Sequence, residues 1–294
     1  MEGEIQVVEG YRGSKKSIPE VRDRLQSRVL VLVLVPFLLF GAVSVTIRSA
    51  AASASPFQPL VLPVLFSFGL AALAWRTRSS TLAAAGTGLA ACMILSQAPM
   101  GLTGLGGTPL ARPALMPLIA LSLLAFGATR FGRTAKERRG LAEHRSGRQA
   151  SQILANIGVA AFCAWMGWYA GCIAALAEAA ADTVSSEIGQ AVGGKAWLIT
   201  TFRRVLPGKD GGVSLAGSVA GVAAVGVVVG AGSLHHALGS DPALVFTAAC
   251  VGLLFDSFLG ATVEERGWLG NDLVNFSSTL LAATLPYVWI ARSR

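Results

Sequence analysis

Residues 29–47 read VLVLVLVPFLLFGAVSVTI, a run of 19 positions without a charged side chain. A lipid hydrocarbon core about 30 Å thick needs about 20 such residues in a helix. Basic residues precede the run and Arg48 follows it directly, although 49–54 also resembles a signal-peptide cleavage site. The length of the run and the position of Arg48 favour a retained membrane helix over a cleaved signal peptide.

Eight further apolar stretches follow this helix. Of the 294 residues, 53% are hydrophobic and only 14% are charged, which excludes a soluble domain. Only Trp168–Gly171 separates the fifth stretch from the sixth, so those two could form one bent helix. The sequence therefore predicts an all-α, polytopic transmembrane helical bundle of nine spans, or of eight if these two fuse. The nine are 29–47, 57–75, 82–100, 113–129, 152–168, 171–189, 212–234, 242–262 and 273–290.

Positive charge predicts the orientation of the bundle, because short cytoplasmic loops carry an excess of Lys and Arg. With nine spans and a cytoplasmic N-terminus, the inner segments hold 20 of the 24 Lys and Arg residues. Fusing the fifth and sixth spans would move Lys195, Arg203, Arg204 and Lys209 outside and weaken this asymmetry. The nine-span orientation is therefore preferred. It corresponds to a multi-pass protein of a bacterial inner membrane or a eukaryotic endomembrane.

The net charge of +8 lies in these inner loops and predicts attraction to anionic membrane lipids. Nucleic acid is not an expected partner, because no basic stripe is interleaved with aromatic residues. The charge pattern divides the chain into four parts. These are a basic cytoplasmic tail (1–28), scaffold helices (29–129), a charged cytoplasmic loop (130–151) and a C-terminal catalytic membrane region (152–294).

Acidic residues at membrane depth mark the C-terminal region as the functional one. Each costs about 2.5 kcal/mol or more to insert and usually belongs to a site or a pathway. On a helix, Glu178, Asp182 and Ser185 share one face, and two carboxylates with a hydroxyl form a plausible divalent-cation ligand set. Glu187 lies about 140° from Asp182, so it joins that set only if the helix unwinds near Gly189.

A polar loop at 198–214 follows this helix and contains a glycine-rich turn. Backbone N–H groups at a helix start can cradle phosphate oxygens while Lys and Arg neutralise their charge. The alternative is an ordinary solvated loop, since the pattern is not a Walker A motif. The predicted nucleotide- or phosphate-binding residues are Thr200, Thr201, Arg203, Arg204, Gly208, Lys209, Gly211, Gly212 and Ser214.

Two later spans add polar groups at the same predicted inner face. Asp256 lies about two turns inside the inner end of the eighth span, and Asn271 and Asn275 begin the ninth. The predicted topology brings them to the same membrane face as Asp182 and the loop at 198–214. This convergence is the strongest indication of a single site. All three histidines, His144, His235 and His236, lie away from it, which argues against histidine catalysis.

Two other residue types have structural interpretations. Cys92, Cys163, Cys172 and Cys250 fall inside apolar spans without metal-site or disulfide spacing and are expected to be packing residues. The glycines of the seventh span form GxxxG pairs, which let neighbouring helices approach closely in lipid. They are Gly217, Gly221, Gly226 and Gly230.

The polar motifs of the C-terminal half resemble a known family. They read Glu178-xxx-Asp182-Thr-x-x-Ser186-Glu187-Ile-Gly, then Ile199-Thr-Thr-Phe-Arg-x-Val-x-x-Gly208-x-x-Gly-Gly-x-Ser214-x-x-Gly217, Asp256-Ser-x-Leu-Gly-Ala-Thr and Asn271-x-x-Val-Asn275-x-x-Ser-Thr279. In order and spacing they resemble the integral-membrane family of plant and cyanobacterial phytyl-phosphate kinases, to which animal transmembrane protein 19 belongs. The chain departs from the pattern at Lys209-Asp210 and at Asp272.

The resemblance implies transfer of a phosphoryl group from a nucleoside triphosphate, CTP or ATP, to an isoprenyl monophosphate, which gives an isoprenyl diphosphate. On this interpretation Asp182, Glu187 and Asp256 are catalytic, and Asp182 and Asp256 with Glu178 or Glu187 hold Mg²⁺. Asn271 and Asn275 orient the acceptor, whose prenyl tail lies between helices. The departures leave the nucleotide and the lipid open. The rival hypotheses are an ion-coupled transporter, which predicts charges accessible from both sides, and a non-catalytic membrane protein.

Overall fold

The computed structural model describes residues 18–51, 55, 57–97, 114–138, 147–234 and 241–292. The three histidines, the tail at 1–17 and the glycine-rich connection at 101–107 lie outside them. The first half contains α2 (Glu20–Ala51), α3 (Gln58–Arg76), α4 (Leu82–Gln97), α5 (Leu115–Arg130) and α6 (Arg133–Arg138). The second half contains α7 (Ala150–Ile153), the π-helix η1 (Leu154–Gly158), α8 (Val159–Met166), α9 (Tyr169–Val192), α10 (Leu215–Ser233), α11 (Pro242–Leu259), the π-helix η2 (Gly260–Glu264) and α12 (Asn271–Arg292).

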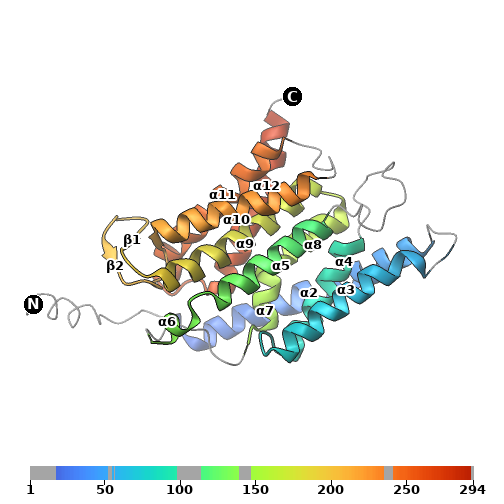
Figure 1. The fold of residues 1–294 in the computed structure, drawn as a ribbon, viewed down its shortest axis with the longest axis horizontal. Helices are drawn as coiled ribbons and strands as arrows, with labels where there is room; N and C mark the ends of the chain where they lie inside the picture. The colour runs from blue at the N-terminus through green and yellow to red at the C-terminus, as the bar shows by residue number, and fades with distance from the viewer. Residues whose placement is uncertain are drawn as a thin grey trace, which may run out of the picture.

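The predicted helical architecture is confirmed, and each of the nine apolar stretches has a helical counterpart (Figure 1). The fifth and sixth stretches are separate helices, since α8 ends at Met166, Gly167 adopts a positive φ of 75° and α9 begins at Tyr169. In the part of the chain that the structure describes, four helices are long and apolar enough to cross a membrane by length and composition: α2, α3, α10 and the continuous α11–η2. The number of spans and the orientation of the bundle stay predictions.

Helix α9 lies at the centre of the bundle and contacts α5, α8, α10, α11 and α12. Its alanine-rich sequence lets these neighbours approach closely, and Ile173 and Leu176 are fully buried. Because so many helices surround α9, its polar residues are shielded from lipid. This placement reduces the cost of carrying carboxylates at membrane depth.

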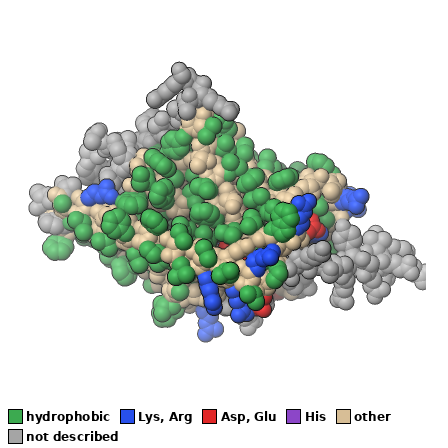
Figure 2. Space-filling view, turned by 180° about the vertical axis from the view of Figure 1, so that it is seen from behind, with side chains coloured by type: hydrophobic (Ala, Val, Ile, Leu, Met, Phe, Trp, Pro, Cys, Tyr) green, Lys and Arg blue, Asp and Glu red, His purple; other side chains and the backbone are tan. Residues whose placement is uncertain are grey.

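The outside of the bundle is apolar, as expected of a protein embedded in lipid. Leu32, Leu65 and Leu123 have exposed fractions of 73%, 66% and 68%. Figure 2 shows hydrophobic side chains over most of the visible face, while most visible Lys and Arg side chains lie along its lower right edge. We call the end of the bundle that carries the loops 77–81, 131–132, 147–149, 193–214 and 265–270 the basic end.

A small β-sheet at the basic end is a feature that the all-α prediction did not include. Strands β1 (Ala196–Leu198), β2 (Arg204–Val205) and β3 (Gly212–Ser214) pair antiparallel in the order β2-β1-β3. The polar loop at 198–214 is therefore a structured element. It projects at the left of Figure 1, at the same end as α6.

Close packing explains two of the four glycines in the predicted GxxxG pairs. A Cβ on Gly217 would lie 2.5 Å from the Ser185 carbonyl oxygen, and one on Gly221 would lie 3.0 Å from the Ser185 Cβ. These glycines therefore bring α10 against α9. Gly226 has only an ordinary contact with Phe246, and Gly230 has no neighbour within 4 Å among the described residues.

Candidate functional site

A cavity of about 390 Å³ opens at the basic end, between α9, α10, α11, α12 and residues 207–212, which we call the glycine-rich loop. Most of the predicted site residues line it, although they come from four separate stretches of the chain. These are Asp182, Glu187, Gly208, Lys209, Gly211, Gly212, Ser214, Asp256, Asn271 and Asn275. The predicted convergence of the polar motifs is thus observed in the structure. We call this space the polar cavity.

Carboxylates from two helices meet at the inner end of the polar cavity. Asp182 of α9 and Asp256 of α11 line it and lie close enough to interact electrostatically. Glu178 lies one turn from Asp182, has only 1% of its surface exposed and also lies within electrostatic reach of both aspartates. Gly252 makes room for it, because a Cβ there would lie 2.7 Å from the Glu178 Cγ. The bundle is therefore built to hold these three carboxyl groups close together.

The residue types of this acidic cluster fit a hard divalent cation. Among the described residues, no hydrogen-bond partner reaches the buried Glu178 Oε1 atom. The described part of the chain contains no group of three His, Cys, Asp or Glu residues that could hold a metal ion by itself. Mg²⁺ usually takes one or two carboxylates and completes its shell with water and substrate phosphates. The cluster suits an ion that arrives with a phosphate ligand, and Mg²⁺ stays a prediction.

The glycine-rich loop forms the opposite wall of the polar cavity. Gly208 and Gly211 have φ values of 84° and 71°, which L side chains rarely adopt. Gly211 rests directly on η2, where an added Cβ would collide with the backbone of Ala261. Ser214 caps the start of α10 by accepting a hydrogen bond from the Gly217 N–H at 3.1 Å. The glycine-rich loop and the N-terminus of α10 thus line the cavity together.

The cations predicted to bind phosphate lie in two different places. Lys209 lines the polar cavity, where its Nζ donates to Glu265 Oε1 at 2.8 Å. Four residues at or beside the turn between β1 and β2 are exposed and are not among the lining residues: Thr200, Thr201, Arg203 and Arg204. Their role in phosphate binding stays a prediction.

The two asparagines lie on the first turns of α12, at the edge of the polar cavity. With its amide nitrogen turned toward α11, Asn275 donates to Asp256 Oδ1 at 3.3 Å and to the Asn271 carbonyl at 3.1 Å. Ser278 Oγ also donates to Asp256 Oδ1, at 3.3 Å. These contacts fix the Asp256 carboxylate from the side of α12.

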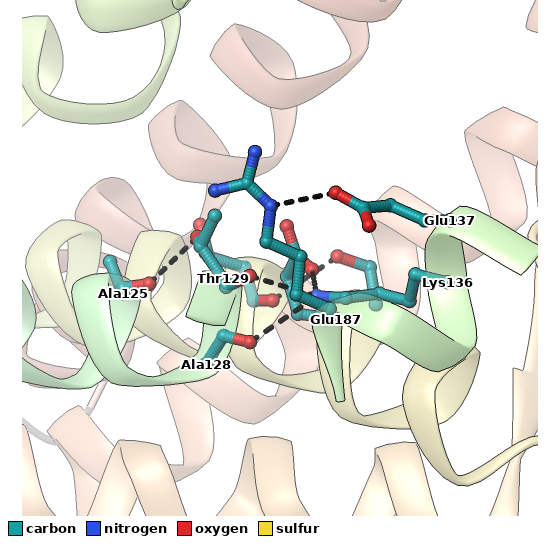
Figure 3. A network of polar contacts seen from close by, with 9 residues as sticks. Ala125, Ala128, Thr129, Lys136, Glu137 and Glu187 are labelled. Atoms are coloured by element: carbon teal, nitrogen blue, oxygen red, sulfur yellow. Dashed lines mark hydrogen bonds and ion pairs between the residues drawn. The ribbon is translucent and has the colours of Figure 1, made fainter. Parts of the chain in front are cut away.

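Glu187 combines a cavity position with a structural contact that the sequence prediction did not include. It forms a buried ion pair with Lys136 of α6, and Figure 3 shows the two side chains meeting between α6 and α9. Lys136 Nζ also donates to the carbonyls of Thr129 (3.0 Å) and Ala128 (3.4 Å). The pair ties the loop after α5 to the central helix. The catalytic role of Glu187 stays a prediction.

Sequence reasoning missed Arg148 as a site residue. It lines the polar cavity and is the cation that acts electrostatically on Asp182. Its backbone pairs with the loop after α3, since Arg148 N donates to Ser79 O and Thr81 N donates to Arg148 O, each at 3.0 Å. In the sequence, Arg148 is one of several cations in the charged loop at 130–151. Only its long-range backbone pairing distinguishes it from the other cations of that loop.

Both π-helices border the polar cavity. Asn156 of η1 and Gly260 and Glu264 of η2 line it. In η1, the carbonyl of Ala155 accepts a hydrogen bond from Thr279 Oγ1 at 3.1 Å. Single π-helical turns are frequent at functional sites because they re-aim side chains within a helix. The sequence analysis did not predict these π-helices.

Comparison with known proteins identifies the family. The family described as integral membrane protein DUF92 matches residues 65–283, which include every residue that lines the polar cavity. The chain belongs to this family. The expected membership of an integral-membrane family with these motifs is confirmed, and the protein is an integral membrane protein. No solved structure is significantly similar to the chain.

Relatives of this DUF92 chain occur in a cyanobacterium and in a plant. It is 33% identical over 182 residues to an uncharacterized membrane protein of Synechocystis, sll0875, an alignment that covers 57% of this chain and 70% of the relative. It is 31% identical over 173 residues to Protein VTE6, chloroplastic, of Arabidopsis thaliana, which covers 53% of this chain and 52% of that protein. The chain thus spans about half the length of VTE6.

Proposed function

We propose that this protein transfers the terminal phosphoryl group of a nucleoside triphosphate, CTP or ATP, to an isoprenyl monophosphate at the basic end of the bundle. The observation that carries the proposal is the polar cavity itself, where clustered carboxylates face a glycine-rich loop and a capped helix N-terminus. Phosphoryl transfer is mainly a matter of positioning and charge stabilisation, and these are its usual parts. Family membership and the resemblance of the motifs to phytyl-phosphate kinases support the same reaction.

The loop and the acidic cluster have separate roles in this proposal. Backbone N–H groups around Gly208 and Gly211 and the start of α10 bind the nucleotide phosphates, while Lys209 exchanges Glu265 for a phosphate oxygen. Asp182 and Asp256, supported by Glu178, would hold Mg²⁺. When bound, Mg²⁺ would neutralise charge on the phosphate oxygens during transfer.

The acceptor needs no general base. A monophosphate ester is largely dianionic near neutral pH, since its second pKa is about 6. An oxygen of the acceptor phosphate attacks the γ-phosphorus, the bond from that phosphorus to the bridging oxygen of the β-phosphate breaks, and the nucleoside diphosphate leaves. Asn275 and Asn271 orient the acceptor phosphate beside Asp256. Arg148 offsets negative charge on the side of Asp182.

Product formation tests the proposal directly. Purified protein in lipid nanodiscs is incubated with CTP or ATP, Mg²⁺ and a series of isoprenyl monophosphates, and the diphosphate product is measured by mass spectrometry. We expect one nucleotide and a subset of chain lengths to give the isoprenyl diphosphate in equal amount with the nucleoside diphosphate. No diphosphate with any combination would overturn the proposal.

A further inference from the structure

A second cavity, of about 510 Å³, lies beside the polar cavity between α3, α4, α5 and α9. Its deeper part is apolar and is lined by Leu70, Cys92, Leu118 and Ile157. On α5 it extends from Leu118 to Arg130, twelve residues or about 18 Å along the helix axis. Its volume is in the range of ligand sites. We call this space the apolar cavity.

The mouth of the apolar cavity is strongly basic. Five cations line it, at the same end of the bundle as the polar cavity: Arg78, Arg130, Arg133, Lys136 and Arg148. Three of them already have partners. The Arg130 guanidinium lies 3.3 Å from the centre of the Phe126 ring, Arg133 pairs with Glu137 at 3.0 Å, and Lys136 pairs with Glu187 (Figure 3).

The remaining two cations at the mouth are held close to an unsatisfied hydroxyl. Among the described residues, neither Arg78 nor Arg148 forms an ion pair. Ser80 also lines the cavity, and its Oγ atom is buried with no hydrogen-bond partner in the described part of the chain. A buried hydroxyl without a partner is costly, by about 1–3 kcal/mol, and is uncommon in proteins. It is therefore evidence for a ligand atom at this point.

The backbone fixes this arrangement. Ser80 and Arg148 form a parallel β-bridge, which holds the two residues next to each other. Gly147 has a φ of 74° and no space for a side chain, since a Cβ would lie 2.9 Å from Arg78 O. Arg78 itself has a φ of 56°, an uncommon value for a residue with a side chain. The loop after α3 and the segment before α7 thus form one rigid rim.

The two cavities adjoin each other. Arg148, Asn156, Thr183 and Glu187 line both of them. A ligand with its apolar part in the apolar cavity and its anionic head at Ser80 and Arg148 would present that head to the polar cavity. The basic mouth and the apolar part of the cavity below it fit an amphipathic molecule with a compact anionic head.

We propose that the apolar cavity binds the chain of the isoprenyl monophosphate acceptor, with its phosphate held by the Ser80 hydroxyl and the Arg148 guanidinium. This inference rests on the proposed function for the identity of the lipid. It gives the N-terminal helices α3, α4 and α5 a role in recognising substrate, whereas the sequence predicted only a scaffold there. Arg148 then bridges the acceptor phosphate and Asp182.

Two glycines of α4 provide a matched pair of variants. Gly88 lines the apolar cavity, and the nearest atom to an added Cβ is Ile153 Cγ2 at 3.9 Å, so Gly88→Leu fills the cavity without a clash at Cβ. Gly86 is exposed on the same helix with no neighbour within 4 Å, so Gly86→Leu makes the same chemical change outside the cavity. Both changes raise the helix propensity of α4 equally.

The decisive measurement is the KM for acceptors of two chain lengths. For a C20 isoprenyl monophosphate, we expect Gly88→Leu to raise KM about 10-fold or more and to leave the nucleotide KM unchanged, while Gly86→Leu changes neither. A five-carbon monophosphate should not distinguish the two variants, because it is too short to reach Gly88. Ser80→Ala should raise KM for both acceptors by about 10-fold, as expected for a lost phosphate contact. Equal KM values for the two glycine variants with the C20 acceptor would overturn the inference.

A binding experiment without nucleotide separates this inference from the proposed function. A photoreactive C20 isoprenyl monophosphate is crosslinked to the protein in nanodiscs, and the labelled peptides are mapped. Labelling of α4 and α5 that Gly88→Leu abolishes would support the inference even if no diphosphate forms, in which case only the kinase proposal fails. Labelling elsewhere, or equal competition by excess phosphatidylglycerol, would overturn it.

Discussion

The buried ion pair between Lys136 and Glu187 leads to a quantitative prediction. Only 3% of the Lys136 side chain and 11% of the Glu187 side chain are exposed. Removing one member of such a pair leaves the other charge buried and costs about 3–5 kcal/mol. Lys136→Met should fall at the upper end of this range, because the Glu187 carboxylate loses its cation. Glu187→Gln should fall at the lower end, because Lys136 keeps the carbonyls of Ala128 and Thr129 as acceptors.

A double-mutant cycle measures this pair, and α6 offers a matched control. Arg133 and Glu137 pair on the same helix, but their side chains are 60% and 49% exposed. Unfolding free energies in bicelles should give a coupling energy of about 2–3 kcal/mol for Lys136 and Glu187. The exposed pair should give about 0.2–1 kcal/mol. Coupling in the buried pair no larger than in the exposed one would refute the reasoning. Loss of turnover by Glu187→Gln with unchanged stability would instead support the catalytic role.

Three further predictions concern the loop, the helix packing and the cation. Gly211→Ala and Gly194→Ala should each lose about 1–3 kcal/mol of stability, because both have positive φ. Only Gly211→Ala, whose added Cβ would collide with Ala261, should also raise the KM for nucleotide. Equal nucleotide KM values for the two variants would contradict a role of this contact in nucleotide binding. Gly217→Ala should lower the thermal unfolding temperature, since its Cβ meets α9, whereas Gly230→Ala should not lower it. Removal of divalent cations with EDTA should abolish diphosphate formation and Mg²⁺ should restore it; activity that persists in EDTA would exclude the predicted cation.

Much of the helical framework was predictable from the sequence, because apolar runs of membrane length are strong signals. The convergence of the polar motifs was also predictable. Topology alone placed Asp182, Asp256 and the glycine-rich loop at one end of the bundle, and the structure brings them together around one cavity. The ideal helix angle separates Glu187 from Asp182, yet both line the polar cavity on a continuous α9, and the angle could not name Lys136 as the partner of Glu187.

The remaining features depend on contacts between segments far apart in sequence. Arg148 is one of several cations in a basic loop, and only its backbone pairing with residues 79–81 brings it to the site. The β-sheet at 196–214 pairs strands of two or three residues, which are too short to leave an alternating pattern. The apolar cavity lies among helices whose sequences are apolar and carry no distinctive polar motif. Its signal is the Ser80 hydroxyl, which has no hydrogen-bond partner among the described residues and can be recognised only in the folded structure.

The most direct test of the central claim compares two Asp-to-Asn variants in the transfer assay. Asp182→Asn alters the acidic cluster of the polar cavity, whereas Asp241→Asn changes the N-cap of α11, a position where Asn caps as well as Asp. With γ-labelled nucleotide, Mg²⁺ and isoprenyl monophosphate, we expect Asp241→Asn to transfer label like the wild type. Asp182→Asn should transfer it at least about 100-fold more slowly, the usual effect of removing a preorganised electrostatic group. Equal transfer of label by the two variants would contradict the account.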